Sequence, residues 1–228
     1  MWKRNDPYSI ADLAGDAVAI LDVLDIRKAH LVGLSLGGMI AQQIAINQPD
    51  RVASLTLMLT SGFIGDPDLP GMTSRYVVNS LLKGLPLFKY RIMGGEKNRI
   101  KERVATTIIH SGYEGLNIRE IAEMVLYELR ERPRTNLKAA WRHHVAATIS
   151  GSRYAGLKKL NIPTLVIHGT ADQLIPVAHG KKLVESIPNA RGIWIEGIGH
   201  VFPLPDMDDI NQQIMSHMQL ATQSTGVL

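Results

Sequence analysis

HLVGLSLGGMIAQQ, residues 30–43, places one serine between two glycines where an apolar run gives way to a helical pattern. The order Gly33-Leu-Ser35-Leu-Gly37 is typical of a nucleophile elbow, in which a strand turns sharply into a helix and raises the serine hydroxyl toward a substrate. We expect this tight turn to leave no room for a side chain at either glycine. The elbow also predicts that the Leu36 backbone N–H, at a helix N-terminus, points toward a developing oxyanion.

Apolar periodicity around this stretch predicts alternating helices and strands. Ser9 and Asp12 form a plausible N-cap pair at the start of the first helix. The helix before Pro49 must end there, because proline disfavours helical geometry in the preceding residue. The expected elements are a helix over 9–24, a strand over 30–34, a helix over 37–48 and a strand over 52–59. This alternation predicts an α/β fold with a mostly parallel sheet covered by helices.

Strand signals fade in the middle of the chain and return after it. We predict a core over 1–61, a helical cap over 62–152, a second part of the core over 153–220 and a flexible polar tail over 221–228. In the second part of the core, the sequence IPTLVIHG and the sequence RGIWIE are expected strands, and 176–187 and 206–220 are expected helices.

A serine hydroxyl is a weak nucleophile until a base takes its proton. Asp172 follows the strand that ends near His168, and His200 lies in a glycine-bordered loop after the strand RGIWIE. The order Ser35, Asp172, His200 is the one expected for a Ser-Asp-His triad on an α/β sheet. His200 would then act as the general base, and Asp172 would fix its tautomer and stabilise the imidazolium.

Several other polar residues are weaker candidates. Asp66 and Asp68 lie in a turn and are rivals to Asp172 as the acid. The His168-Gly169 pair is interpreted as a strand-end packing feature. His143 and His144 resemble a metal pair, but adjacent helical residues point in different directions and no third ligand is evident, so we predict no metal and no cofactor.

Composition narrows the classes of partner. Lysine and arginine total 25 against 21 aspartates and glutamates, and much of the excess lies within 75–103, diluted by leucine and isoleucine. That pattern is typical of a solvated helical face, so we expect no nucleic-acid partner. No apolar run reaches the about 18 residues of a membrane span. With no cysteine and no apolar segment after the charged first residues, we expect a cytoplasmic location.

The chain resembles the α/β-hydrolase superfamily, in particular the lidded serine esterases similar to aclacinomycin methylesterase. The resemblance rests on YSIADLAGDAVAILD, HLVGLSLGGMIAQQIAINQPDRVASLTLM, GDPDLPG, PTLVIHGTADQLIP and IEGIGHVFP. It implies a triad of Ser35, Asp172 and His200, a cap over the pocket and a small-molecule ester as substrate. Serine at the elbow disfavours the related dehalogenases and epoxide hydrolases, which use aspartate there.

Similar family members begin with further strands and a His-Gly loop that supplies a second oxyanion N–H. The resemblance therefore implies that the N-terminal part of the sheet is missing here. We expect the strand over 30–34 to have an exposed edge that favours homo-oligomers. Loss of one oxyanion donor would lower turnover by about 10²–10³.

Three functional hypotheses stay open from the sequence. The first is a carboxylic ester hydrolase that forms an acyl-enzyme on Ser35. The second is a cofactor-free peroxidase or perhydrolase, which resembles the first in sequence and uses the same triad. The third is a truncated hydrolase-fold protein with weak or no activity that acts by binding or self-association.

Overall fold

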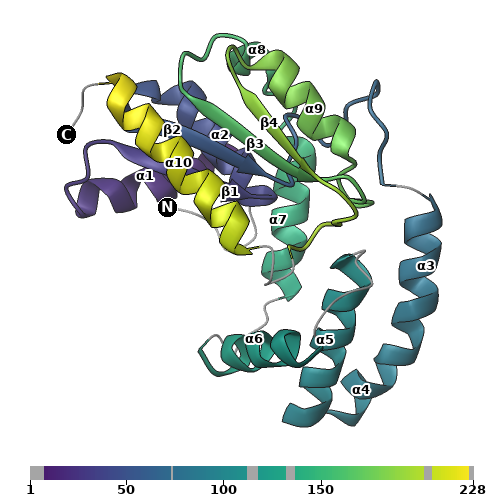
Figure 1. The fold of residues 1–228 in the computed structure, drawn as a ribbon. Helices are drawn as coiled ribbons and strands as arrows, with labels where there is room; N and C mark the ends of the chain where they lie inside the picture. Colours follow the sequence, from purple (N-terminus) through teal and green to yellow (C-terminus); the bar gives the residue numbers. More distant parts are fainter. Residues whose placement is uncertain (1–7, 73, 112–117, 132–136, 203–206, 226–228) are drawn as a thin grey trace.

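The computed structural model describes residues 8–72, 74–111, 118–131, 137–202 and 207–225, which form a parallel sheet with helices around it (Figure 1). The strands are β1 (Ala29–Leu34), β2 (Val52–Met58), β3 (Thr164–Gly169) and β4 (Arg191–Ile195). They pair in the order β1-β2-β3-β4, and every pair is parallel. The prediction of an α/β fold with a parallel sheet is confirmed.

Helices cover both faces of the sheet because its strands carry apolar side chains on both sides. α1 (Ile10–Val23), α2 (Leu36–Asn47) and α9 (Val177–Ser186) contribute to one apolar cluster, and α10 (Met207–Thr225) contributes to another. Successive strand residues alternate between the two clusters, as a period of two requires. Val166 belongs to the first, whereas Leu165 and Ile167 belong to the second. Within the described ranges, no helix has the length and hydrophobicity needed to cross a membrane.

The first helix begins where the N-cap pair predicts. The Asp12 N–H donates to Ser9 Oγ at 3.2 Å, and the Ser9 N–H donates to Asp12 Oδ2 at 2.7 Å. This reciprocal capping box satisfies two donors that the first turn would otherwise leave open. The capping prediction is confirmed.

The last helix is longer than the sequence pattern suggests. We expected 221–228 to be a flexible tail, but α10 continues to Thr225. Ala221 is buried, and the Thr222 hydroxyl donates to the Met218 carbonyl oxygen at 3.0 Å. Packing of one small apolar side chain therefore extends the helix through a polar sequence. Residues 226–228 lie outside the described part of the chain.

A helical segment connects β2 to β3. It contains α3 (Ser74–Gly84), α4 (Phe88–Met93), α5 (Glu96–Ser111), α6 (Ile118–Glu131) and α7 (Leu137–Ile149). Helices α3 to α6 stand away from the sheet, whereas α7 runs back toward it (Figure 1). Ala146 and Ala147 of α7 are buried in a cluster with Ile10, Met39 and Ile175. The connecting segment thus touches the core close to the start of α2.

β1 lies at one edge of the sheet. It pairs with β2, and no other strand of the described ranges pairs with it. Val32 is 45% exposed and Leu34 is 51% exposed, which is unusual for apolar residues of a parallel strand. The exposed edge expected from the sequence is therefore present in this chain.

Candidate active site

Ser35 occupies the turn between β1 and α2 in a conformation that most residues avoid. Its φ is 51° and its ψ is −114°, and such a positive φ costs a non-glycine residue about 1–3 kcal/mol. Two hydrogen bonds hold the turn. The Ser35 N–H donates to the Met58 carbonyl oxygen at 2.8 Å, and the Thr60 hydroxyl donates to the Ser35 carbonyl oxygen at 2.7 Å. The end of β2 and the segment just after it therefore keep the serine in its strained position.

The glycines around Ser35 have different surroundings. A Cβ on Gly33 would overlap the Gly37 carbonyl oxygen, and a Cβ on Gly38 would lie 2.6 Å from the Thr60 side chain. A Cβ on Gly37 would meet no atom within 4 Å. Our expectation of steric exclusion on both sides of the serine is thus met at Gly33 and wrong at Gly37. The second crowded position is Gly38, because α2 approaches the segment after β2 there.

The predicted acid and base lie beside the serine, although Asp172 comes 137 positions after Ser35 along the chain. Because β1, β3 and β4 are parallel, the segments that follow them all begin at the carboxyl ends of the strands, on the same side of the sheet. Ser35 Oγ lies 3.0 Å from His200 Nε2, and His200 Nδ1 lies 2.8 Å from Asp172 Oδ2. A carboxylate can only accept, so His200 carries its proton on Nδ1 and Nε2 accepts from the serine hydroxyl.

Asp172 is held as an anion by several donors. Its side chain is fully buried, and its Oδ1 accepts the backbone N–H groups of Leu174 and Ile175, each at 2.9 Å. Burial raises the pKa of the Asp172 carboxyl, but the nearby N–H groups of His168, His200 and Ile175 outweigh it and lower that pKa to about 2. The carboxylate therefore remains charged at neutral pH without contact with water.

The loops that carry Asp172 and His200 are fastened to each other. The Ala171 N–H donates to the Ile198 carbonyl oxygen at 3.0 Å, and the Gly197 N–H donates to the Thr170 hydroxyl at 2.9 Å. A Cβ on Gly169 would overlap the Ile198 carbonyl oxygen, so a glycine is needed at the end of β3. These contacts fix the distance between acid and base.

Leu36 is the first residue of α2, so its N–H is one of the four that have no partner within the helix. The residue also borders the cavity next to Ser35. A helix N-terminus carries partial positive charge, which favours a negative oxygen nearby. This position agrees with the oxyanion role expected for the Leu36 N–H.

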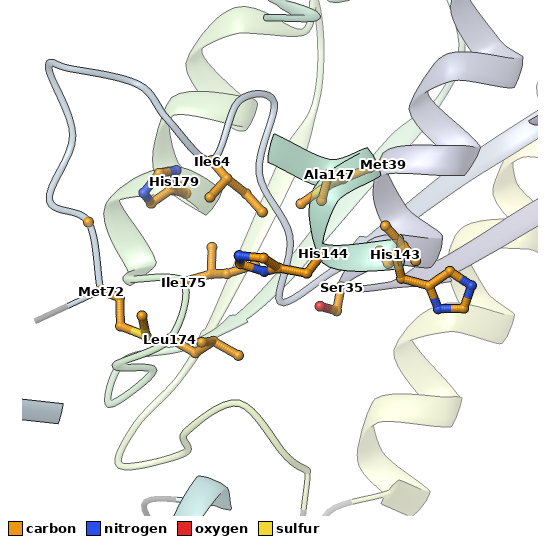
Figure 2. Close-up of a pocket in the computed structure, with 12 residues that line it drawn as sticks. Ser35, Met39, Ile64, Met72, His143, His144, Ala147, Leu174, Ile175 and His179 are labelled. Atoms are coloured by element: carbon orange, nitrogen blue, oxygen red, sulfur yellow. The ribbon is translucent and has the colours of Figure 1, made fainter. Parts of the chain in front are cut away.

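A mostly apolar cavity of about 220 Å³ opens beside Ser35 (Figure 2). Its lining comes from the turn at Ser35 and the start of α2, the loop that carries Asp172, α7, the start of α9 and the segment after β2. The lining residues are Ser35, Leu36, Met39, Ile64, Gly71, Met72, His143, His144, Ala147, Leu174, Ile175 and His179. No lysine, arginine, aspartate or glutamate is among these residues. The cavity therefore suits a neutral, largely apolar ligand.

His179 fastens the segment after β2 over the cavity. Its Nε2 donates to the Pro70 carbonyl oxygen at 3.0 Å, and its Nδ1 lies 2.8 Å from Ser61 Oγ, which accepts the Phe63 N–H at 2.9 Å. Burial is the main cause that lowers the pKa of His179, so its neutral form is favoured. This hydrogen-bond chain keeps the cavity wall in place.

Three histidines of this cavity, His143, His144 and His179, are not predicted as lining residues by the sequence. His143 and His144 were considered only as a metal pair, and both line the cavity from α7, where Figure 2 shows them near Ser35. The His143 ring packs edge-on against Tyr8, with 5.7 Å between the ring centroids. Two adjacent histidines on a helix were the available signal. No group of three or more metal-ligating side chains occurs within the part of the chain that the structure describes.

The rival acids lie elsewhere. The Lys182 ammonium donates to Asp66 Oδ2 at 2.6 Å, and this hydrogen bond lowers the pKa of the Asp66 carboxyl. The Asp68 side chain is 84% exposed and lies 4.0 Å from Lys182. Asp172, by contrast, is the carboxylate in contact with His200. The choice of Asp172 over its rivals therefore agrees with the observed contacts.

Comparison with known proteins identifies the family to which this fold belongs. The family model for the alpha/beta hydrolase fold matches residues 2–206, which is most of the chain. The chain belongs to the α/β-hydrolase family. This membership accounts for the parallel sheet flanked by helices.

Curated members of the α/β-hydrolase family with similar sequences include two kinds of methyl ester esterase. Rhodomycin D methylesterase DauP from Streptomyces sp. (strain C5) is 30% identical over 95% of this chain and 75% of its own length. Pimeloyl-[acyl-carrier protein] methyl ester esterase from Aeromonas hydrophila is 28% identical over 85% of this chain and 70% of its own length. The chain therefore shares the family of known esterases.

Solved α/β-hydrolase structures share the fold at lower identity. A meta-cleavage product hydrolase from Pseudomonas fluorescens IP01 superposes with a TM-score of 0.69 at 21% identity, over 97% of this chain and 75% of the other. The enol-lactonase from Burkholderia xenovorans LB400 superposes with a TM-score of 0.64 at 23% identity, over 93% of this chain and 74% of the other. At these identities the similarity concerns the fold alone.

Proposed function

We propose that this α/β-hydrolase is a carboxylic ester hydrolase that forms an acyl-enzyme on Ser35. The observation that carries the proposal is the continuous line of contacts from Ser35 Oγ to His200 Nε2 at 3.0 Å and from His200 Nδ1 to Asp172 Oδ2 at 2.8 Å. A serine joined in this way to an imidazole and a buried carboxylate can lose its proton as it attacks.

The proposed reaction has two halves. His200 Nε2 takes the Ser35 proton while Oγ attacks the ester carbonyl carbon and forms a tetrahedral intermediate. When the intermediate collapses, the ester C–O bond breaks and the alcohol leaves with the proton from His200. Water then attacks the acyl group, again giving a proton to His200, and the carboxylic acid leaves as Oγ recovers its proton. Asp172 keeps the imidazolium oriented and stabilised throughout.

The N-terminus of α2 would stabilise the oxyanion that forms in this reaction. The Leu36 N–H at the start of α2 would donate to the oxyanion of each tetrahedral intermediate, where a preorganised donor is worth more than in water. A single donor of this kind typically accounts for about 10²–10³ in turnover.

The lining of the cavity indicates the class of substrate. The cavity beside Ser35 is apolar and holds no ionisable carboxylate, ammonium or guanidinium among its lining residues. We propose that it binds a neutral ester with an apolar acyl or alcohol part, and that residues 62–152 act as a cap over it. The names of two related proteins, a rhodomycin D methylesterase and a pimeloyl-[acyl-carrier protein] methyl ester esterase, favour a methyl ester among such substrates.

The proposal is tested by hydrolysis of p-nitrophenyl esters by the wild-type chain and by Ser35→Ala. We expect p-nitrophenyl butyrate to be hydrolysed with a higher kcat/KM than a p-nitrophenyl ester with a carboxylate on its acyl chain. Ser35→Ala should lose about 10³-fold or more of kcat, because the nucleophile is removed. Equal rates for wild type and Ser35→Ala would exclude Ser35 as the nucleophile.

The second candidate is a non-catalytic role in binding or self-association, for which the exposed edge of β1 offers a surface. Val32 and Leu34 are about half exposed there, so the chain can associate through this strand whether or not it is active. A fluorophosphonate probe separates the two roles, because only an activated serine reacts with it. Labelling of wild type but not of Ser35→Ala supports the esterase, and the absence of labelling supports the binding role. A peroxide-dependent oxidation assay distinguishes a perhydrolase from both.

A further inference from the structure

A second imidazole lies behind the carboxylate of Asp172. His168, in β3, is fully buried, and its Nε2 lies 2.8 Å from the Ile175 carbonyl oxygen. The same nitrogen lies 3.5 Å from Asp172 Oδ2. The sequence pattern predicts a packing role for His168, yet its Nε2 is directed at the turn that carries Asp172.

The surroundings of the His168 ring decide which nitrogen bears its proton. A carbonyl oxygen only accepts, so Nε2 carries the hydrogen and donates to Ile175. Nδ1 is buried with no hydrogen-bond partner among the described residues. It faces Gly180 of α9, where a Cβ would lie 2.7 Å from it. A proton on Nδ1 would therefore be buried without an acceptor, so the N–H that the surroundings support is the one on Nε2, on the side of Asp172.

This N–H acts at two points of the same turn. Ile175 donates its backbone N–H to Asp172 Oδ1 and accepts from His168 through its carbonyl oxygen, so the imidazole fixes the peptide that fixes the carboxylate. Asp172 Oδ2 lies between two imidazoles, with His200 Nδ1 at 2.8 Å and His168 Nε2 at 3.5 Å. A rotation of the carboxylate away from His200 would thus break contacts on both oxygens.

We propose that His168 is a positioning residue of the Ser35–His200–Asp172 site, which it serves by holding the turn of residues 172–175 and the Asp172 carboxylate in line with His200. The inference rests on the proposed function, since positioning matters to turnover only if the site is catalytic. His168 does not reach the substrate, because it is fully buried behind Asp172 and is not among the residues that line the cavity.

The test compares His168→Gln with His168→Met. Glutamine can place an amide N–H near the position of Nε2, whereas methionine fills a similar volume and has no donor. For His168→Met we expect kcat with p-nitrophenyl butyrate to fall about 10- to 100-fold with KM unchanged, because a small misplacement of a catalytic group has that effect. His168→Gln should recover most of the loss. Equal losses in the two variants, or no loss in His168→Met, would overturn the proposal.

Gly180→Ala provides a second route that leaves His168 in the sequence. The new Cβ would push against Nδ1 and shift the ring. This crowding lowers Tm whatever the role of His168, as overpacking of a buried site does, so Tm alone does not separate the two roles. A merely structural role predicts an unchanged kcat when activity is measured well below Tm, whereas we expect kcat to fall. An unchanged kcat in Gly180→Ala counts against the proposal even if His168→Met does not fold.

A readout independent of turnover separates this inference from the proposed function. The proton shared by His200 Nδ1 and the Asp172 carboxylate should give a far-downfield NMR resonance in wild type and in His168→Gln. In His168→Met it should broaden or disappear. If wild type hydrolyses no ester but this resonance responds to His168 as described, the proposed function fails and the positioning role stands. If hydrolysis depends on Ser35 but the resonance and kcat are the same in all variants, the positioning role fails alone.

Discussion

Gly33 and Gly37 are both glycines and flank the same serine, but we expect Gly37 to tolerate substitution and Gly33 not to. Gly33→Ala would drive a methyl group into the Gly37 carbonyl oxygen, which belongs to rigid backbone. We expect it to lower the free energy of unfolding by about 1–3 kcal/mol, as overpacking does, and to lower the proposed ester hydrolysis by shifting Ser35. Denaturant unfolding and p-nitrophenyl butyrate hydrolysis measure the two effects.

Gly37→Ala is the matched control for this prediction. It adds the same methyl group in α2, where no atom lies within 4 Å. We expect the free energy of unfolding to stay the same or rise by about 0.5–1 kcal/mol, because alanine favours a helix over glycine. If both variants were equally destabilised, the steric account of the elbow would be wrong.

The Asp172 carboxyl predicts how stability depends on acid. Its pKa is lowered from 3.8 to about 2 in the folded chain, so its contribution to stability is fully present above the unfolded pKa and is lost as pH falls toward the folded pKa. From about pH 5 to about pH 2, the free energy of unfolding of wild type should fall by about 2 kcal/mol more than that of Asp172→Asn. Urea unfolding of both proteins across this range checks the difference. Parallel pH curves would mean that the carboxyl is not held as an anion by its neighbours.

At the scale of elements, a buried arginine joins the two ends of the segment between β2 and β3. Arg153 is only 4% exposed, and burial lowers the pKa of its guanidinium to about 10. Its Nε donates to Gln42 Oε1 at 3.0 Å, and its Nη2 donates to the Ser61 carbonyl oxygen at 3.0 Å. Its backbone N–H donates to the Gly62 carbonyl oxygen at 3.0 Å. The start and the end of the segment are thus fastened to each other and to α2.

Removing this guanidinium should weaken the whole junction. We expect Arg153→Met to lower the free energy of unfolding by about 1–3 kcal/mol, because it leaves the Gln42 amide oxygen buried without its donor. Gln42→Leu should lower it by a similar amount. The double variant should lose less than the two single variants added together, with a coupling of about 0.5–3 kcal/mol.

The exposed Lys158, close by in the sequence, provides the control for the junction. Lys158→Met should change the free energy of unfolding by no more than about 0.5 kcal/mol, as surface substitutions usually do. Strict additivity between Arg153→Met and Gln42→Leu would contradict a shared network.

For the whole molecule, we expect the edge of β1 to govern association of the chain in concentrated solution. The unpaired backbone of an edge strand, next to the half-exposed Val32 and Leu34, is a template for pairing with another copy. We expect sedimentation velocity to show a mass that rises with concentration for wild type. Val32→Lys should remain monomeric at the same concentrations, because a charge on an edge strand opposes pairing.

Val23→Lys is the matched control, since Val23 is 85% exposed on α1 and is not part of β1. It should associate as wild type does. A wild-type chain that is monomeric throughout the concentration series would refute association through β1.

The sequence by itself determined the features that arise from local patterns. Apolar periodicity predicted the helices and strands, because an element that buries one face carries apolar residues at the regular spacing of that face. The serine elbow predicted Ser35, and the order of polar residues after the expected strands predicted Asp172 and His200. The carboxyl ends of parallel strands lie together, so the sequence could predict that these three residues belong to one site without knowing any distance between them.

Only the tertiary structure decided which distant groups come into contact. It showed that an added Cβ would meet no atom at Gly37 but would be crowded at Gly38, because the crowding comes from Thr60 in a separate segment. It placed His168 behind Asp172 and brought Arg153 to Gln42, 111 residues earlier. Ala221 likewise extends α10 by packing in the core. Such contacts depend on how elements pack in three dimensions, and no periodic pattern in the sequence records that packing.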